Sequence, residues 1–195
     1  YDIFSPLPEL ISQRLLTLHA LGQGGRGILI VPVASLMQRL APRSFVDANS
    51  LLIDPGQQLD FDAFRERLVH AGYRNVAQVL EHGEFAVRGS LIDLFPMGSD
   101  VPYRIDLFDD EVDSIRTFDP ETQRTLEKVP RIKLLPAREF PLNDDAIKRF
   151  RKTFRETFDS DPQASLIYRD VSDGKPPGGI EYYLPLLATM KAARM

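Results

Sequence analysis

Two segments decide the fold of this chain: GEFAVRGSLIDLFP, residues 83–96, and YRIDLFDDEVDSIRTFD, residues 103–119. Apolar and polar side chains alternate along both, as they do in β-strands that bury one face. The alternation predicts three consecutive strands, with Asp109 and Asp110 at the turn between the second and the third. The expected product is an antiparallel sheet with one apolar face and one polar face.

The same alternation distributes the side chains over the two faces. In the first predicted strand, one face takes Phe85, Val87, Leu91 and Phe95, and the other takes Glu84, Ala86, Arg88 and Ser90. In the second, the apolar face takes Tyr103, Ile105 and Leu107, and the polar face takes Arg104, Asp106 and Phe108.

A large aromatic ring beside two arginines makes the polar face a candidate protein-binding surface. Aromatic and Arg side chains are enriched at the centres of such interfaces. We therefore single out Arg88, Arg104 and Phe108, and expect both arginines to be exposed and to contribute little to folding. One alternative stays open for Phe108, since a bulge after Leu107 would turn its ring into the core.

The composition narrows the function classes. The 195 residues contain no cysteine, which excludes a disulfide framework, a thiolate metal site and a Cys nucleophile. The net charge of -4 argues against an extended phosphate-binding surface, although local contact with DNA stays open. With no signal peptide and no apolar run that could span a bilayer, we expect a cytoplasmic protein. Because the chain opens at Tyr1 within a helical pattern, we also expect it to be part of a longer protein.

Around the strands predicted over 83–96 and 103–119, the sequence predicts a compact α+β domain over Ser50–Leu135. An amphipathic helix begins at Asp60, and a further strand over 133–135 is expected to close the sheet. The apolar stripe of that helix is Phe61, Phe64, Leu68 and Ala71. The helix should cover the apolar side of the sheet and leave the candidate surface open.

The flanking segments have a different pattern. A helix over Ser5–Leu21, a buried strand at 28–32 (ILIVP) and a second helix over Ala34–Leu40 are the order of an open α/β domain. After Pro136, residues 144–158 form a helix with an aromatic stripe, and a shorter helix ends at Gly174. The basic run of the first of these helices, Lys148, Arg149, Arg151, Lys152 and Arg155, is explained better by a solvated helix face than by a nucleic-acid patch.

No catalytic constellation is evident. The glycine-rich loops at 22–27 (GQGGRG) and 174–179 (GKPPGG) lack the Lys and Ser/Thr of a P-loop. The three histidines, His19, His70 and His82, have no metal-ligand spacing, and the acidic residues at 109–111 are explained by a turn. The residues therefore favour a binding module without cofactor or metal over an enzyme.

The series VRGSLIDLFP, PYRIDLFDDEVDSIRTFDPETQRT and PAREFP resembles the N-terminal UvrB-homology module of the bacterial transcription-repair coupling factors, the Mfd family. A looser similarity extends from Tyr1 to Leu187. The resemblance implies an α/β chain in three parts. Residues 1–49 would begin a helicase-like domain (UvrB domain 1a-like), 50–135 would be an inserted domain 2-like unit that binds UvrA, and 136–195 would return to the helicase-like domain (1b-like).

The resemblance also implies a function: a non-catalytic module that recruits the repair protein UvrA to stalled transcription complexes. The UvrA-binding positions of the family match Arg88, Arg104 and Phe108, while Asp106 aligns with an acidic position of UvrB, and Ala86 replaces a further arginine. The parent protein would be an ATP-dependent DNA translocase that meets RNA polymerase and DNA through other parts. Two alternatives stay open, a degenerate helicase-like domain that contacts DNA directly and a part of a P-loop ATPase.

Overall fold

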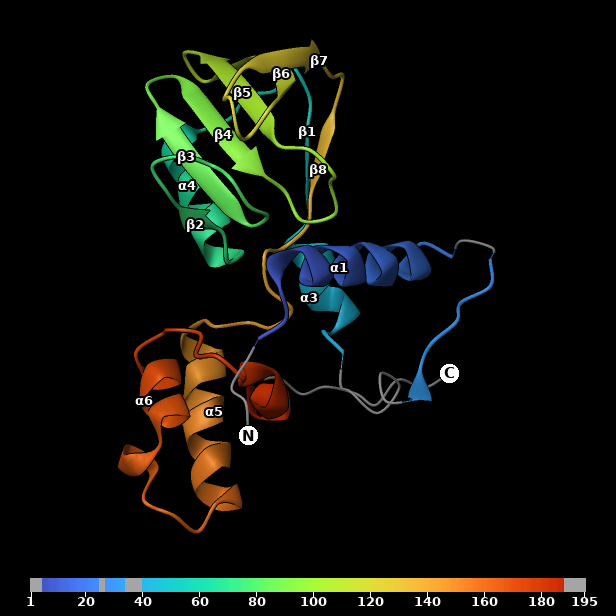
Figure 1. The fold of residues 1–195 in the computed structure, drawn as a ribbon. Coiled ribbons are helices and arrows are strands. Elements are labelled where there is room, and N and C mark those ends of the chain that lie inside the picture. Colours follow the sequence, from blue (N-terminus) through green and yellow to red (C-terminus); the bar gives the residue numbers. More distant parts are fainter. Residues whose placement is uncertain (1–4, 25–26, 34–39, 188–195) are drawn as a thin grey trace. The chain divides into compact units, whose positions relative to one another are not determined.

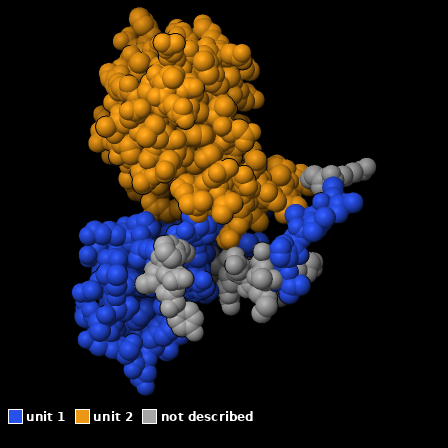
Figure 2. Space-filling model, in the orientation of Figure 1, with its two compact units in different colours: residues 1–6, 25–45, 139–195 blue, residues 7–24, 46–138 orange. Residues whose placement is uncertain are grey.

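A computed structural model describes residues 5–24, 27–33 and 40–187 and shows a mixed α/β chain (Figure 1). The chain divides into two compact units, which Figure 2 colours separately. One unit comprises 7–24 and 46–138, and the other comprises 1–6, 25–45 and 139–195. Residues 7–24 therefore cluster with the central unit, although the expected ranges placed them in the first flank.

The central unit is built on a six-stranded sheet with the strand order β2-β3-β4-β5-β6-β7 (Figure 1). The pairing of β2 with β3 is parallel and all other pairings are antiparallel. The strands are β2 (Arg74–Asn75), β3 (Glu84–Arg88), β4 (Leu91–Phe95), β5 (Tyr103–Phe108), β6 (Glu111–Phe118) and β7 (Thr125–Lys128).

The first of the three predicted strands is in fact a hairpin of two strands, β3 and β4. Gly89 adopts a φ of 60°, which glycine tolerates, and together with Ser90 it reverses the chain. The turn places Leu91 opposite Arg88 and changes which positions face the core. The assignment of Leu91 and Phe95 to the face of Phe85 is therefore wrong, because these two residues share the face of Arg88.

Helix α4 (Phe61–His70) covers the apolar face of the sheet, as predicted. Its N-terminus is capped by Asp60, whose carboxylate accepts the backbone N–H of Ala63 at 2.8 Å. The helix and the sheet bury one apolar cluster, which includes Phe64, Leu68, Ala71, Phe85, Ile92, Leu94 and Ile105. Burial of this set is the main apolar contribution to the stability of the unit.

The opposite face of the sheet is only partly polar. A second buried cluster lies on it and consists of Val79, Ala86, Phe95 and Phe118. Ala86 was expected on an open polar face, but it is buried. Ala86 is buried because the segment at Val76 and Val79 packs over this part of the sheet.

A separate two-stranded sheet joins the two ends of the central unit. In it, β1 (Leu51–Ile53) pairs antiparallel with β8 (Ile132–Leu134). The strand expected at 133–135 therefore pairs with the first strand of the unit and does not close the main sheet, whose edge is taken by β7. Next to β8, the buried Tyr73 hydroxyl donates to the Leu135 carbonyl at 2.6 Å, and burial raises its pKa.

Helix α1 (Pro8–Gly22) belongs to the central unit through contacts near β8. The hydroxyl of Ser12 accepts the backbone N–H of Gly98 at 2.7 Å, and the side chain of Leu15 is fully buried. A short helix, α3 (Arg43–Ala48), leads into β1.

The second unit is helical in the residues that follow Glu139. The aromatic stripe of α5 is confirmed, since Phe150 and Phe154 pack with Tyr168, Ile180 and Leu184 in one buried cluster. Asn143 caps α5 by accepting the backbone N–H of Ala146. The elements are α5 (Asp144–Thr157), the 3₁₀ turn η1 (Pro162–Ala164), α6 (Leu166–Ser172), the 3₁₀ turn η2 (Ile180–Tyr183) and α7 (Leu184–Leu187).

The predicted strand at 28–32 is not formed. Its backbone pairs with no strand of the described ranges, and Ile28 is 94% exposed. An apolar run becomes a buried strand only where neighbouring strands satisfy its backbone groups, and the strands in the described ranges pair with one another. The helix predicted over 34–40 lies, apart from Leu40, outside the described residues. In those described ranges we find no helix with both the length and the apolar character needed to cross a bilayer.

Replacing Phe64 by Ala should lower the free energy of unfolding of the central unit by about 3 to 5 kcal/mol, because the lost ring leaves a cavity between α4 and the sheet. Val69→Ala, on the exposed side of the same helix, is the control and should change it by less than about 0.5 kcal/mol. Urea unfolding followed by circular dichroism measures both. Similar effects of the two substitutions would contradict the burial of this helix face.

Candidate protein-binding site

The carboxylate of Asp93, in the middle of β4, is the centre of the polar face. Its side chain is 1% exposed and forms ion pairs with two arginines. Arg104 on β5 binds it with both ends of the guanidinium, Nε to Oδ1 at 2.6 Å and Nη2 to Oδ2 at 2.9 Å. Arg88 on β3 adds Nη2 at 3.2 Å from Oδ2. The strand order places Asp93 between its two partners, so the carboxylate links three neighbouring strands.

Arg104 is largely buried and contacts Asp93, Thr125 and the Phe118 ring, whereas we expected it to be exposed. Its side chain is 15% exposed, Nη1 donates to Thr125 Oγ1 at 2.7 Å, and the guanidinium lies 5.0 Å from the ring centroid of Phe118. The hydrogen bonds to Asp93 raise the pKa of the Arg104 guanidinium. The expectation that Arg104 is exposed is therefore wrong, and we now expect it to contribute to folding, because its removal would leave a buried carboxylate short of its main partner.

Arg88 is the more accessible arginine. Its side chain is 45% exposed, and Nη2 also donates to Gln123 Oε1 at 2.9 Å. Gln123 lies in the loop between β6 and β7 with a φ of 62°, and its amide nitrogen donates to the carbonyls of Pro120 and Val79. Asp119 shapes the same loop by accepting the N–H groups of Thr122 and Glu121, and these bonds lower its pKa. The loop and Asp93 therefore hold the Nη2 end of the Arg88 guanidinium, while much of the side chain stays exposed to solvent.

Phe108 lies at the end of β5 with its side chain 75% exposed. The sheet does contain a bulge beside it, but the extra residue is in β6, because Asp106 faces Ser114 while Leu107 faces Val112. The alternation of β5 is thus undisturbed, and the alternative that turned the ring into the core is wrong. Leu107 is buried in its place.

Asp106 shares the face of Arg104 and Phe108, and its side chain forms no hydrogen bond or ion pair with the residues that the structure describes. It lies opposite Leu91 on one side and Ser114 on the other. Arg88, Leu91 and Asp106 form one row across three strands, and Phe108 follows two positions along β5. The structure thus brings Arg88, Asp106 and Phe108 to one open surface and places Arg104 beneath it.

Sequence reasoning missed two residues that organise this surface and one that extends it. Asp93 could have been found from the sequence, since a charged residue in the centre of an apolar strand indicates a buried ion pair. The missed hairpin concealed its face. Gln123 carried no signal, because a glutamine in the left-handed region of a loop has no sequence pattern. The third residue is Arg116 on β6. It lies opposite Arg104 on β5 and opposite Lys128 on β7, so these three basic residues form a second row across the sheet.

This arrangement is suited to docking a protein. An exposed ring and a half-exposed guanidinium on one face of the sheet supply an apolar anchor and a fork of donors for carboxylates. In the described part of the chain, no group of three or more His, Asp or Glu side chains is placed to hold a metal ion.

Comparison with known proteins agrees with this chemistry. Residues 51–140 match the sequence model of the UvrB interaction domain family, so the sheet that carries the surface belongs to a protein-interaction domain of the UvrB type. Over 186 residues, or 95% of its length, the chain is 55% identical to the transcription-repair-coupling factor of Escherichia coli. The corresponding proteins of Haemophilus influenzae and Staphylococcus epidermidis are 54% and 38% identical over 95% and 78% of the chain.

The chain belongs to the transcription-repair-coupling factor family, which confirms the resemblance stated from the sequence. It spans 16% of the length of the Escherichia coli and Haemophilus influenzae relatives and 13% of that of Staphylococcus epidermidis.

Asp93→Asn keeps the size of the side chain and removes its charge, so the largely buried Arg104 guanidinium loses its anion. We expect the free energy of unfolding to fall by about 3 to 5 kcal/mol. Asp106→Asn is the control, the same substitution on the same face at a partly exposed position, and should change it by less than about 0.5 kcal/mol. Denaturant unfolding measures both. A loss under about 1 kcal/mol for Asp93→Asn would refute the organising role of its carboxylate.

Proposed function

We propose that this chain is a non-catalytic docking module through which a coupling factor recruits UvrA to stalled transcription complexes. The observation that carries the proposal is the exposed ring of Phe108 on the same sheet face as the oriented guanidinium of Arg88, in a UvrB interaction domain. An exposed phenylalanine favours self-association unless a partner covers it. A preorganised arginine loses less conformational freedom on binding than a free one.

We assign different roles to the four candidate residues. Phe108 and Arg88 make the direct contacts, with the ring entering an apolar pocket of UvrA and the guanidinium meeting an acidic group beside it. Arg104 acts as a positioning residue, because Asp93 and Thr125 already take most of its donors. Asp106 stays accessible between them and would repel an acidic surface, so it selects which part of UvrA can approach.

The wider context rests on the family. We propose that 50–135 is the inserted UvrA-binding domain and that 1–49 and 136–195 are the two parts of a helicase-like domain. The match over 51–140 supports the first of these ranges. In the whole protein, contacts with RNA polymerase and DNA and an ATP-dependent translocase activity would lie in other parts, in the cytoplasm. Neither glycine-rich loop has the sequence of a P-loop, which speaks against ATP hydrolysis by this part.

Phe108→Ala should weaken UvrA binding by about 1 to 4 kcal/mol, as expected for an aromatic anchor, while the melting temperature stays unchanged because the ring is exposed. Arg88→Ala should weaken binding in the same range. Leu52→Ala removes an exposed apolar side chain from the separate β1–β8 sheet and serves as the control, with binding unchanged. Calorimetric titration of purified UvrA measures all three.

Binding by Phe108→Ala that equals wild type would contradict the proposed surface. A fall in melting temperature together with lost binding would instead place the ring in the core, against the structure.

A further inference from the structure

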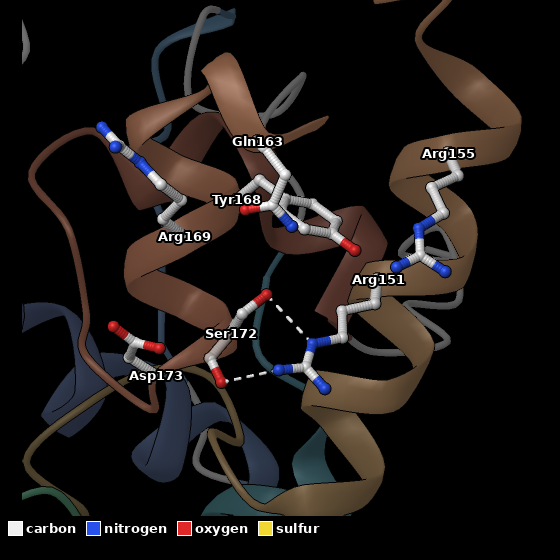
Figure 3. Close-up of a pocket in the computed structure, with 7 residues that line it drawn as sticks. All are labelled: Arg151, Arg155, Gln163, Tyr168, Arg169, Ser172 and Asp173. Carbon is white, nitrogen blue, oxygen red and sulfur yellow. Dashed lines mark hydrogen bonds between the residues drawn. The ribbon is translucent and has the colours of Figure 1, made fainter. Parts of the chain in front are cut away.

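The helical unit has a pocket of about 450 Å³ between α5 on one side and η1 with α6 on the other (Figure 3). Arg151 and Arg155 line it from α5, Gln163 from η1, and Tyr168 and Ser172 from α6. All of these residues belong to one compact unit. The volume falls within the range of about 300 to 1,000 Å³ that is usual for small-molecule sites.

The hydroxyl of Tyr168 is buried in this pocket without a hydrogen-bond partner in the described ranges. Tyr168 is 2% exposed, and Figure 3 shows its hydroxyl directed toward α5, between Arg151 and Arg155. A buried hydroxyl that makes no hydrogen bond costs free energy, so such groups are rare and point to a missing acceptor or donor. An oxygen of a bound ligand would supply the acceptor.

Three arginines line the pocket, Arg151 and Arg155 from α5 and Arg169 from α6, and give it a positive charge. Arg151 is oriented by Ser172, whose hydroxyl and carbonyl oxygens accept Nε and Nη2, each at 3.0 Å, so its Nη1 end remains available. The Arg155 guanidinium lies 5.6 Å from the ring centroid of Tyr168 and forms no ion pair within the described part of the chain. The one carboxylate of the lining, Asp173, lies 3.9 Å from Lys175.

These contacts divide the basic run of α5 into two sets. Lys148 and Lys152 lie near Asp145 and Glu156 on the solvated side of the helix, at 4.0 Å and 3.9 Å. Arg151 and Arg155 instead line the pocket. The interpretation of this run as a solvated face holds for the four exposed residues, Arg155 included, and fails only for the half-buried Arg151, which is bound to Ser172.

We propose that this pocket binds the phosphate group of a small ligand. Donors reach it from three elements, the guanidinium groups from α5, the Gln163 amide from η1 and the Tyr168 hydroxyl from α6, and such converging donors suit a tetrahedral anion with several acceptor oxygens. Arginine forks match phosphate geometry. The site lies in a different unit from the proposed UvrA surface and does not depend on it.

The test is an NMR titration of the isotope-labelled 195-residue chain with inorganic phosphate and with adenosine monophosphate. Saturable shifts are expected at residues 151–172. Tyr168→Phe removes only the hydroxyl and should weaken binding about tenfold, since hydrogen bonds to charged groups are worth roughly 1.5 kcal/mol or more. Tyr182→Phe, the same change at an exposed tyrosine, should leave binding unaltered.

Charge is tested in the same way. Arg155→Gln should weaken phosphate binding about tenfold. Lys152→Gln removes one positive charge from the solvated side of the same helix and should have little effect at physiological salt. The proposal is overturned if Tyr168→Phe binds like wild type, if the two α5 variants lose affinity equally, or if sodium chloride of equal ionic strength reproduces the shifts. Tighter binding of acetate, or binding of a DNA duplex without binding of either small phosphate, would also overturn it.

Discussion

The ion pairs of Asp93 are the interaction on which the candidate surface depends. A carboxylate that is 1% exposed is tolerated in a sheet only if partners replace the hydrogen bonds to water that it has lost. Arg104 supplies a bidentate pair and Arg88 a single contact, so one buried anion connects β3, β4 and β5. Through Arg104 the network also reaches Thr125 on β7, and through Arg88 it reaches the loop that contains Gln123. The network therefore orients the Arg88 and Arg104 guanidinium groups on this face of the sheet.

This network explains why two arginines that look equivalent in sequence have different tasks. Removing a buried partner leaves an uncompensated charge, whereas removing an exposed one costs mainly the contact it makes. Arg104 falls in the first class, and Arg88 lies between the two. Loss of UvrA binding on substitution of Arg104 would therefore combine damage to the sheet with damage to the surface. Phe108 and Arg88 are the positions at which binding can be separated from folding.

Much of the central unit could be predicted from periodicity. The alternation along 103–119 gave β5, the Asp109–Asp110 turn, β6 and the outward direction of Phe108, and the stripe of Phe64 and Leu68 gave α4. The hairpin at Gly89 was missed because the apolar residues on both sides of it read as one continuous alternation. Its omission moved Leu91 and Phe95 to the wrong face and concealed Asp93. Arg104 is clamped mainly by Asp93, 11 positions away, and Gln123 contacts Arg88 from 35 positions away, and no local pattern encodes such contacts.

The flanking segment at 28–32 was predicted wrongly for a different physical reason. ILIVP has the composition of a buried strand, but a strand forms only where neighbouring backbone groups are available, and those in the described residues pair elsewhere. By contrast, the helix of 144–157 was predicted well, because its cap at Asn143 and its aromatic stripe are local features.

We propose that Asp93 orients the Arg88 guanidinium for binding UvrA but does not itself contact UvrA, and a double-mutant cycle tests this most directly. Asp93→Asn and Arg88→Ala, singly and together, are compared by their dissociation constants for UvrA at a temperature where circular dichroism shows every variant folded. We expect Arg88→Ala to cost much less binding free energy in the Asp93→Asn background than in wild type, with a coupling of about 0.5 to 3 kcal/mol. Additive effects within about 0.5 kcal/mol would contradict it.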